Sequence, residues 1–203
     1  MHKQADREPS FHYVCTHGEA KTKIERHSDF WVSNCGCREG KRSEEGGEGC
    51  KRSRMDLCLF FDDKEMTGTG SGWKKVDRAF VEGILKEARE KRLVARPFHY
   101  DKDRINDQGI CFCCDDCCAY FKGDEWGFDP GAYIEETDMD ACTDCGECER
   151  ACYFGARRIV NGRLQVSKEK EKGCYGCYGC AGCGLCVDVC PEKCIKMVER
   201  DES

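Results

Sequence analysis

The chain has 203 residues, 39% of them hydrophobic and 35% charged, and its formal net charge is −6 at pH 7. This length allows one large domain or two small ones, but the apolar content is low for a core of that size. Charges of both signs are interspersed, which argues against a nucleic-acid-binding protein with a basic face. No apolar run approaches the roughly 18 residues that a membrane-spanning helix needs.

Cysteine dominates the composition, with 21 copies in the chain. Disulfides would need an oxidising compartment, yet residues 1–10 are charged and lack the apolar segment of a secretory signal. An odd number of cysteines also fits a disulfide framework poorly. We therefore expect a cytoplasmic protein in which cysteines bind metal and help to stabilise the fold.

The first 72 residues predict short elements and loops. Residues 19–27 are charged and are expected to be helical, and residues 30–32 predict a short strand. Four spaced cysteines follow between residues 35 and 72. The same region has two glycine-rich patches, 44–49 and 67–72, the second of which predicts a turn or loop.

The clearest helix is predicted over residues 76–94. Its apolar side chains recur at the spacing of one helical face, and Pro97 is expected to end it. The residues of this apolar stripe are Val76, Phe80, Ile84, Leu85 and Ala88. We expect the helix to pack against a core and to take no part in chemistry.

Cysteines gather again at residues 111–118, before a segment with glycine and proline that predicts a linker near residue 130. The sequence therefore predicts two domains. The first is a cysteine-rich N-terminal module at 1–130, and the second covers residues 131–203.

The second domain contains an internal repeat with an offset of 38 residues. The pattern C-x2-C-x2-C-x3-C begins at Cys142 and again at Cys180, with Gly146 and Gly184 at matching positions. This is the run of bacterial two-cluster ferredoxins, in which the fourth cysteine of each repeat ligates the other cluster. Zinc sites instead usually show separated C-x2-C pairs. The repeat therefore predicts two [4Fe–4S] clusters with crossed ligands.

The spacing assigns a ligand set to each cluster. Cluster I takes Cys142, Cys145, Cys148 and Cys190, and cluster II takes Cys180, Cys183, Cys186 and Cys152. Upstream, Cys174 and Cys177 continue the C-x2-C rhythm. These two cysteines could shift the cluster motif upstream, bind a separate ligand or remain free thiols. The Cys190-Pro191 pair favours the motif that starts at Cys180.

Two other positions depart from the repeat. Tyr153 stands where Pro191 stands in the second half, a change that we expect the loop to tolerate. Cys194 aligns with Ala156, and is therefore interpreted as a small packed residue. No role is assigned to Cys15.

Nine further cysteines lie in the N-terminal module. They form one group before the predicted helix, Cys35, Cys37, Cys50 and Cys58, and one after it, Cys111, Cys113, Cys114, Cys117 and Cys118. One cubane cluster needs four thiolates, so we expect one or two further iron–sulfur clusters in this module, with a structural zinc site as the alternative. Arg38 either donates hydrogen bonds to cluster sulfur or is a solvated surface residue.

The order of these motifs resembles a family of 4Fe–4S dicluster-domain proteins. Its members carry a Cys-x-Cys-Arg segment, two spaced cysteines, a helix ending in a Gly-Leu-Val-like turn, a Cys-x-Cys-Cys segment and a two-cluster ferredoxin. The matching positions are Cys35-Gly-Cys37-Arg38, Lys91-Arg-Leu-Val94 and Ile110-Cys-Phe-Cys-Cys114, with Arg92 where the family tends to have glycine. The resemblance implies an electron-transfer component of a larger reductase and specifies no substrate.

Together these motifs predict an iron–sulfur electron carrier, a polyferredoxin that is a relay subunit or dedicated donor of a larger oxidoreductase complex. The predicted fold class is α+β, with a two-cluster bacterial ferredoxin-like domain after a small, metal-stabilised α/β module. No catalytic residue and no nucleotide fingerprint is recognised, and neither nucleic acid nor a membrane is expected as a partner. The alternative is an enzyme subunit whose N-terminal module holds an unusual, substrate-reducing cluster.

Overall fold

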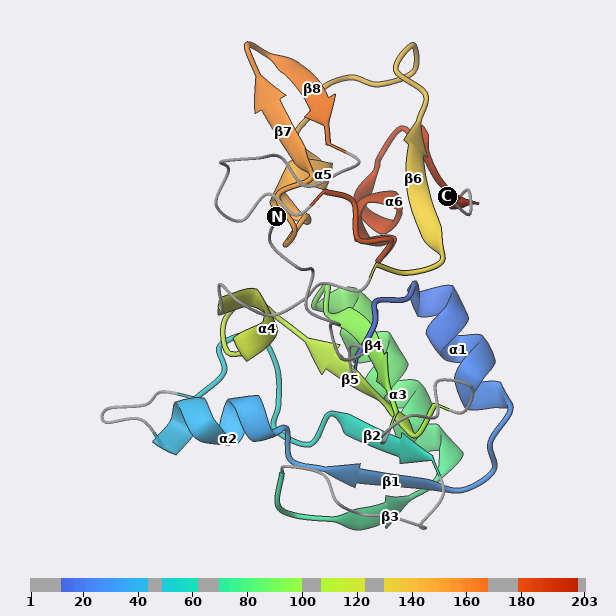
Figure 1. The fold of residues 1–203 in the computed structure, drawn as a ribbon, viewed down its shortest axis with the longest axis vertical. Coiled ribbons are helices and arrows are strands. Elements are labelled where there is room, and N and C mark those ends of the chain that lie inside the picture. The colour runs from blue at the N-terminus through green and yellow to red at the C-terminus, as the bar shows by residue number, and fades with distance from the viewer. Residues whose placement is uncertain are drawn as a thin grey trace, which may run out of the picture.

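The computed structural model describes residues 12–43, 49–61, 70–99, 107–122, 130–167 and 179–200, which form a mixed α and β fold (Figure 1). Several expectations lie outside these described residues. They concern Cys174, Cys177, most of the two glycine-rich patches and the linker at 123–129. No helix within the described ranges is long and apolar enough to cross a membrane.

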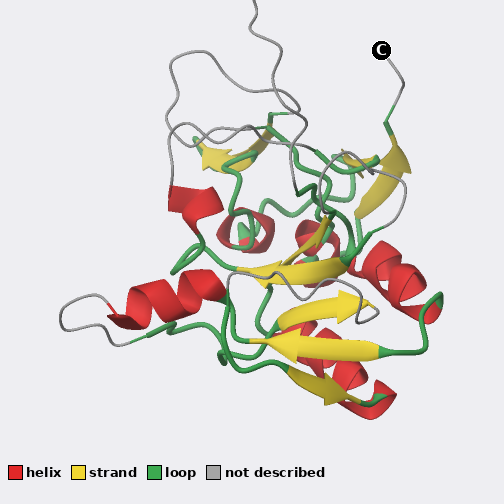
Figure 2. Cartoon of the chain, turned by 60° about the horizontal axis from the view of Figure 1, so that its bottom comes forward, coloured by secondary structure: helices red, strands yellow, loops and turns green. Residues whose placement is uncertain are grey.

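The larger part of the fold is a five-stranded antiparallel sheet with the order β3-β1-β2-β5-β4 (Figure 1). Its elements are α1 (His17–Glu25), β1 (Phe30–Ser33), α2 (Gly36–Ser43), β2 (Cys58–Phe61), β3 (Lys74–Val76), α3 (Arg78–Glu90), β4 (Val94–Phe98), β5 (Gly109–Cys113) and α4 (Ala119–Lys122). In Figure 2 the strands of this sheet run side by side with helices flanking them.

Side chains of α1 and α3 pack with strand residues into the main core. The helix α1 and the strand β1 occur where the sequence predicts them. A capping box starts α1, because Thr16 Oγ1 accepts from the Glu19 amide at 3.1 Å and the Glu19 carboxylate accepts from the Thr16 amide at 2.8 Å. From α3, the core receives Val81, Ile84, Leu85 and Ala88.

The predicted helix at 76–94 is too long at both ends. Val76 belongs to β3, and the helix begins at Arg78 because the side chain of Asp77 caps it by accepting from the Phe80 amide at 2.8 Å. The helix ends at Glu90, before β4 starts. The apolar pattern that seemed to continue it thus belongs to the flanking strands, and all five residues of β4 are buried, including Pro97, which was expected to end the helix.

A left-handed residue ends α3. Arg92 has φ of 55°, and the two hydrogen bonds of a Schellman motif surround it: Arg92 N to Arg89 O at 3.1 Å and Leu93 N to Ala88 O at 2.8 Å. Glycine adopts this conformation without steric cost, which gives a physical reason for the glycine that the resembling family tends to have at this position.

The smaller part holds two two-stranded sheets, β6 with β9 and β7 with β8 (Figure 1). Its elements are β6 (Tyr133–Thr137), α5 (Glu147–Arg150), β7 (Arg157–Val160), β8 (Arg163–Val166), α6 (Leu185–Val189) and β9 (Ile195–Glu199). The two repeats share backbone conformations, since Gly146 and Gly184 precede α5 and α6 with φ of 76° in both cases. The sequence repeat therefore corresponds to a structural one.

Aromatic and aliphatic side chains join the two parts. Val14 and Val94 pack with Phe154, Ala181 and Leu185, and further aromatic rings from α4 and from position 153 lie against this cluster. A polar contact adds to it, because His17 Nε2 lies 2.7 Å from the Leu93 carbonyl while its Nδ1 lies 3.4 Å from the Asp188 carboxylate. The N-terminal segment thus contacts both parts of the fold.

We predict that Arg92→Gly raises the thermal stability of the protein. The substitution relieves a left-handed conformation that costs a non-glycine residue about 1–2 kcal/mol, against an entropic cost of about 0.5–1 kcal/mol for glycine. As a control, Arg89→Gly in the last turn of α3 should lower stability by about 1 kcal/mol. Unfolding midpoints measured at one scan rate check both variants. Equal losses in the two would contradict the prediction.

Candidate metal centres

Four cysteines from both repeats line one small cavity, which we name the first cavity. They are Cys142, Cys145, Cys148 and Cys190. Three belong to the loop before α5 and to α5 itself, and the fourth caps the C-terminus of α6. Apolar side chains, Ile159, Leu164 and Ile195, complete much of the wall. Segments far apart along the chain therefore supply thiols to one space.

A second small cavity shows the reciprocal arrangement. Its cysteines are Cys152, Cys180, Cys183 and Cys186. Cys152 follows α5 in the first repeat, and the other three surround the start of α6 in the second. Each cavity thus collects three cysteines of one repeat and the fourth of the other, which are the ligand sets that the sequence predicts.

The spacing of these thiols fits a cube better than a single ion. No three of the eight sulfur atoms lie within 4.8 Å of one another, as expected if each thiolate binds a different corner of a cluster. Burial raises the pKa of Cys152 and Cys183, and raises that of Cys186 to about 12. Binding of iron must therefore displace a proton from each of these thiols.

Cys194 also lines the first cavity, with its Sγ 3.5 Å from that of Cys190. Burial favours the neutral form of Cys190, but hydrogen bonds from the backbone and side chain of Cys194 outweigh it and lower the pKa of Cys190. Cys194 is packed, as expected, and it also touches a predicted ligand.

A buried ion pair lines the second cavity, and its arginine also contacts a cysteine of the first. Arg157 Nη1 lies 2.8 Å from Glu135 Oε2, and the two side chains are 2% and 3% exposed. Burial opposes the charge of Arg157, but the pKa is raised by Cys186 of the second cavity, by a hydrogen bond with Cys148 of the first, and by Glu135. A fixed positive charge therefore sits beside one cysteine of each cavity, where it can tune cluster potentials.

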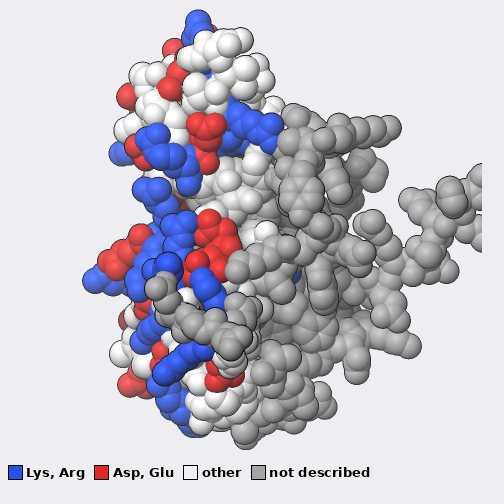
Figure 3. Space-filling model, turned by 90° about the vertical axis from the view of Figure 1, so that its left-hand side faces the viewer, with Lys and Arg blue, Asp and Glu red and all other residues white. Residues whose placement is uncertain are grey.

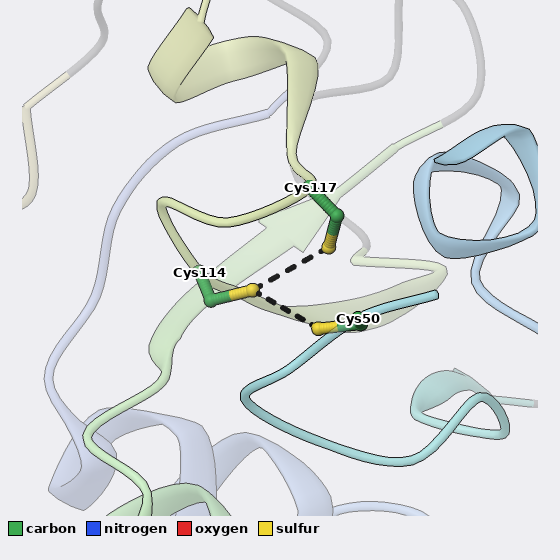
Figure 4. Close-up of side chains that lie close together, drawn as sticks. All are labelled: Cys50, Cys114 and Cys117. Carbon is green, nitrogen blue, oxygen red and sulfur yellow. Dashed lines mark hydrogen bonds between the residues drawn. The ribbon is translucent and has the colours of Figure 1, made fainter. Parts of the chain in front are cut away.

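In the N-terminal module three sulfur atoms converge, which we name the sulfur trio: Cys50, Cys114 and Cys117 (Figure 4). Sγ of Cys114 lies 3.6 Å from that of Cys50 and 3.4 Å from that of Cys117. Hydrogen bonds from Cys117 lower the pKa of Cys114 to about 5, with Arg38 and Cys50 acting in the same direction against burial. The contact therefore favours the thiolate form of Cys114 over that of Cys117.

Six of the other seven N-terminal cysteines, all except Cys15, form a hydrogen-bonded row, which we name the thiol chain. Its order is Cys35, Cys37, Cys118, Cys113, Cys111 and Cys58. Strand pairing places Cys58 opposite Cys111, with their sulfur atoms 3.4 Å apart. His12 Nε2 lies 3.7 Å from the Cys111 sulfur. The pKa of His12 is lowered to about 3, mainly by burial and secondarily by the positive charge of Arg96. His12 is thus a neutral imidazole beside the row.

Two buried arginines accompany these N-terminal thiols. Arg38 is 1% exposed, so the solvated alternative for it is wrong, and its Nη2 lies 3.0 Å from the Phe112 carbonyl and 4.0 Å from the Cys114 sulfur. Arg96 is 6% exposed, is paired with Cys111 across β4 and β5, and lies over the ring of Tyr120. Each buried cation therefore has cysteine sulfur as a close neighbour.

The structure groups the N-terminal cysteines differently from their order along the chain. Cys50 lies with the second sequence group and Cys58 is linked to Cys111, so both predicted groups are divided between the sulfur trio and the thiol chain. The C-x2-C spacing of Cys114 and Cys117 indicated that these two thiols could share a ligand. Nothing in the sequence indicated that Cys50 joins them. His12, Arg96 and Arg157 carry no local motif, and only the strand register brings them to sulfur.

Comparison with known proteins agrees with the C-terminal geometry. Residues 135–158, which contain four cysteines of the first repeat, match the 4Fe–4S binding domain family. A subunit of the ion-translocating oxidoreductase complex of Methanosarcina acetivorans is 30% identical over 69 residues, which are 34% of this chain and 23% of that protein. The chain thus spans less than a quarter of the length of this curated relative. Residues 135–158 of this chain therefore form a 4Fe–4S binding domain.

We predict that the ligands are crossed between the repeats, which paired substitutions can test. Cys152→Ala with Cys183→Ala should remove about four irons, because both residues would hold one cubane. Cys152→Ala with Cys145→Ala should remove about eight, because two cubanes are lost. Iron and sulfide are counted in anaerobically purified full-length protein. The opposite pattern would show that each repeat binds its own cluster.

The ion pair of Arg157 with Glu135 should matter for stability. Arg157→Met leaves a buried carboxylate without its partner, which should destabilise the fold by about 3–5 kcal/mol. Adding Glu135→Gln should recover much of this loss. The guanidinium concentration at which cluster absorbance disappears measures both effects, with Glu136→Gln as an exposed control on the same strand. If the double variant is no better than the single one, the buried charge is not the cause.

Proposed function

We propose that this chain is an electron-relay protein, a polyferredoxin whose residues 131–203 hold two [4Fe–4S] clusters. The observation that carries the proposal is the pair of cavities, each lined by three cysteines of one repeat and the fourth cysteine of the other. Cluster I would take the thiols of the first cavity, and cluster II those of the second. The clusters supply one-electron chemistry, and the chain positions them and sets their potentials through burial and charge.

The thiol chain supports a further iron–sulfur cluster in the N-terminal module at 1–130. Its six cysteines exceed the four thiolates that one cubane needs. Arg96 adds a buried positive charge that would offset an anionic cluster. His12 supplies a neutral imidazole next to the same row. The resemblance to dicluster-domain proteins with an N-terminal cysteine-rich module agrees with this proposal.

Packing between the two parts favours an electron path from the N-terminal module into cluster II. Cys152 and Cys183 lie in the same hydrophobic cluster as the rings of Tyr120 and Phe121, which directly follow the cysteine-rich turn. At the far end, Cys145 of the first cavity is exposed, so cluster I would lie near the surface. Electrons would pass from the N-terminal centre through cluster II to cluster I, or in reverse.

A larger oxidoreductase complex is the partner that we propose. The curated relative carries in its name the role of a subunit in such a complex. Figure 3 shows acidic and basic side chains interspersed on one face of the molecule. A redox partner that docks there would meet paired charges, which favour orientation and partner choice more than raw affinity.

We predict that full-length protein purified without oxygen contains about eight irons in the C-terminal domain and about four in the N-terminal module, four for each cubane. Cys113→Ser with Cys118→Ser should remove about four irons and leave the two ferredoxin clusters reducible. Cys15→Ala, a buried cysteine of the same module, is the control. An unchanged iron content in the double variant would exclude the third cluster. Failure of dithionite to reduce the wild-type clusters would exclude the relay.

A further inference from the structure

The sulfur trio differs from every other cysteine group among the residues that the structure describes. It alone brings three potential ligands within 4.8 Å of one another. The eight ferredoxin cysteines instead line two cavities, four to each, and no three of their sulfurs lie that close together. Figure 4 shows the three thiols of Cys50, Cys114 and Cys117 directed toward one small space. The three sulfurs of the trio are close enough together to bind one metal ion, whereas the ferredoxin cysteines are spaced around a cavity.

The distances match a mononuclear site. A tetrahedral zinc–thiolate bond of about 2.3 Å separates two ligand sulfurs by about 3.8 Å. The two measured separations are 3.6 and 3.4 Å. In a cubane, by contrast, each thiolate binds a different iron, so the sulfurs stand farther apart. We propose that Cys50, Cys114 and Cys117 bind one divalent transition-metal ion, Zn²⁺ or Fe²⁺, as a tetrahedral site separate from the iron–sulfur clusters.

Charge balance supports this composition. Three thiolates and one divalent cation leave one negative charge, and the guanidinium of Arg38 neutralises it. Arg38 is 1% exposed, and its Nε and Nη1 have no hydrogen-bond partner in the part of the chain that is described. Its Nη2 already lies within 4.0 Å of the Cys114 sulfur. A buried cation needs such an anionic partner, and a metal-bound thiolate provides a permanent one.

The residues between the ligands are engaged elsewhere, which leaves the fourth position open. Asp115 pairs with Arg52 at 3.0 Å, and Asp116 pairs with Lys41 at 2.7 Å. Asp116 also accepts from the Lys51 amide at 2.8 Å, next to Cys50. These contacts hold the loop that contains Cys50 against the turn at 114–117. Water or a small ligand completes the tetrahedron, because no fourth protein ligand lies within the same radius among the described residues.

The site has a structural consequence for the joint between the two parts. The turn at 114–117 leads directly into α4, whose Tyr120 and Phe121 pack on Phe154. An ion that fixes this turn therefore also fixes the aromatic contact with the ferredoxin part. Loss of the ion should make the segment around α4 more sensitive to proteolysis, while the two C-terminal cavities keep their cysteines.

The test uses full-length protein purified without oxygen and without chelators. Zinc and iron are counted per chain, and zinc-edge X-ray absorption reports the ligands. We expect one zinc with sulfur neighbours at about 2.3 Å. In zinc-poor medium one extra iron should replace it, with the Mössbauer signature of a mononuclear iron–thiolate site. Cys50→Ser and Cys117→Ser should each lose this ion and keep all cluster iron and sulfide, whereas Cys15→Ala keeps both.

Arg38 gives an independent readout. Arg38→Gln should weaken binding about 10–100-fold in competition with a chelator, and Arg38→Lys, which retains the charge, should weaken it less. Three outcomes would overturn the proposal: no ion beyond the clusters, loss of about four irons with their sulfide from Cys50→Ser, or a Cys114–Cys117 disulfide in the anaerobic protein. Because the site shares no cysteine with the thiol chain, loss of the proposed third cluster would leave this ion in place.

Discussion

Negative charge on buried sulfur is the constraint to which the rest of the structure is fitted. A thiolate in an apolar interior is costly unless a cation compensates it, and the described residues place a buried guanidinium beside each cysteine group. Arg38 lies by the sulfur trio, Arg96 by the thiol chain, and Arg157 by both ferredoxin cavities. Each guanidinium would offset part of the negative charge of the metal–thiolate centre beside it. The same charges that permit burial also set how readily each centre accepts an electron.

The small apolar core follows from this arrangement. The main core joins two helices to one face of a five-stranded sheet, and two smaller clusters serve the ferredoxin part. Cysteines contribute to all three clusters, either as members or as packed neighbours. Metal binding would then supply part of the folding free energy, because ligands from distant segments are tied to a common centre. A chain with this composition would otherwise have little apolar surface with which to hold its sheet.

Local patterns in the sequence predicted the C-terminal half well and the N-terminal half partly. The repeat of Cys142 and Cys180 is local, so its spacing anticipated which thiols share each cavity. The meeting of Cys58 with Cys111 depends on the register of β2 against β5, and no short motif encodes it. The end of α3 was misplaced because flanking strands continued its apolar pattern. Only Arg92, standing where the resembling family tends to have glycine, marked the true boundary.

The N-terminal segment has a consequence for how the protein is made. Val14 packs against Ala181 and Leu185, while its neighbour Cys15 bridges to Ala95. During synthesis the first of these contacts must wait until its partners are made, because Ala181 and Leu185 lie 167 and 171 positions after Val14 in the sequence. Contacts between such distant residues form late and slowly. The joint between the two parts is therefore completed only once the second repeat has been made, after all the cysteines of the sulfur trio and the thiol chain.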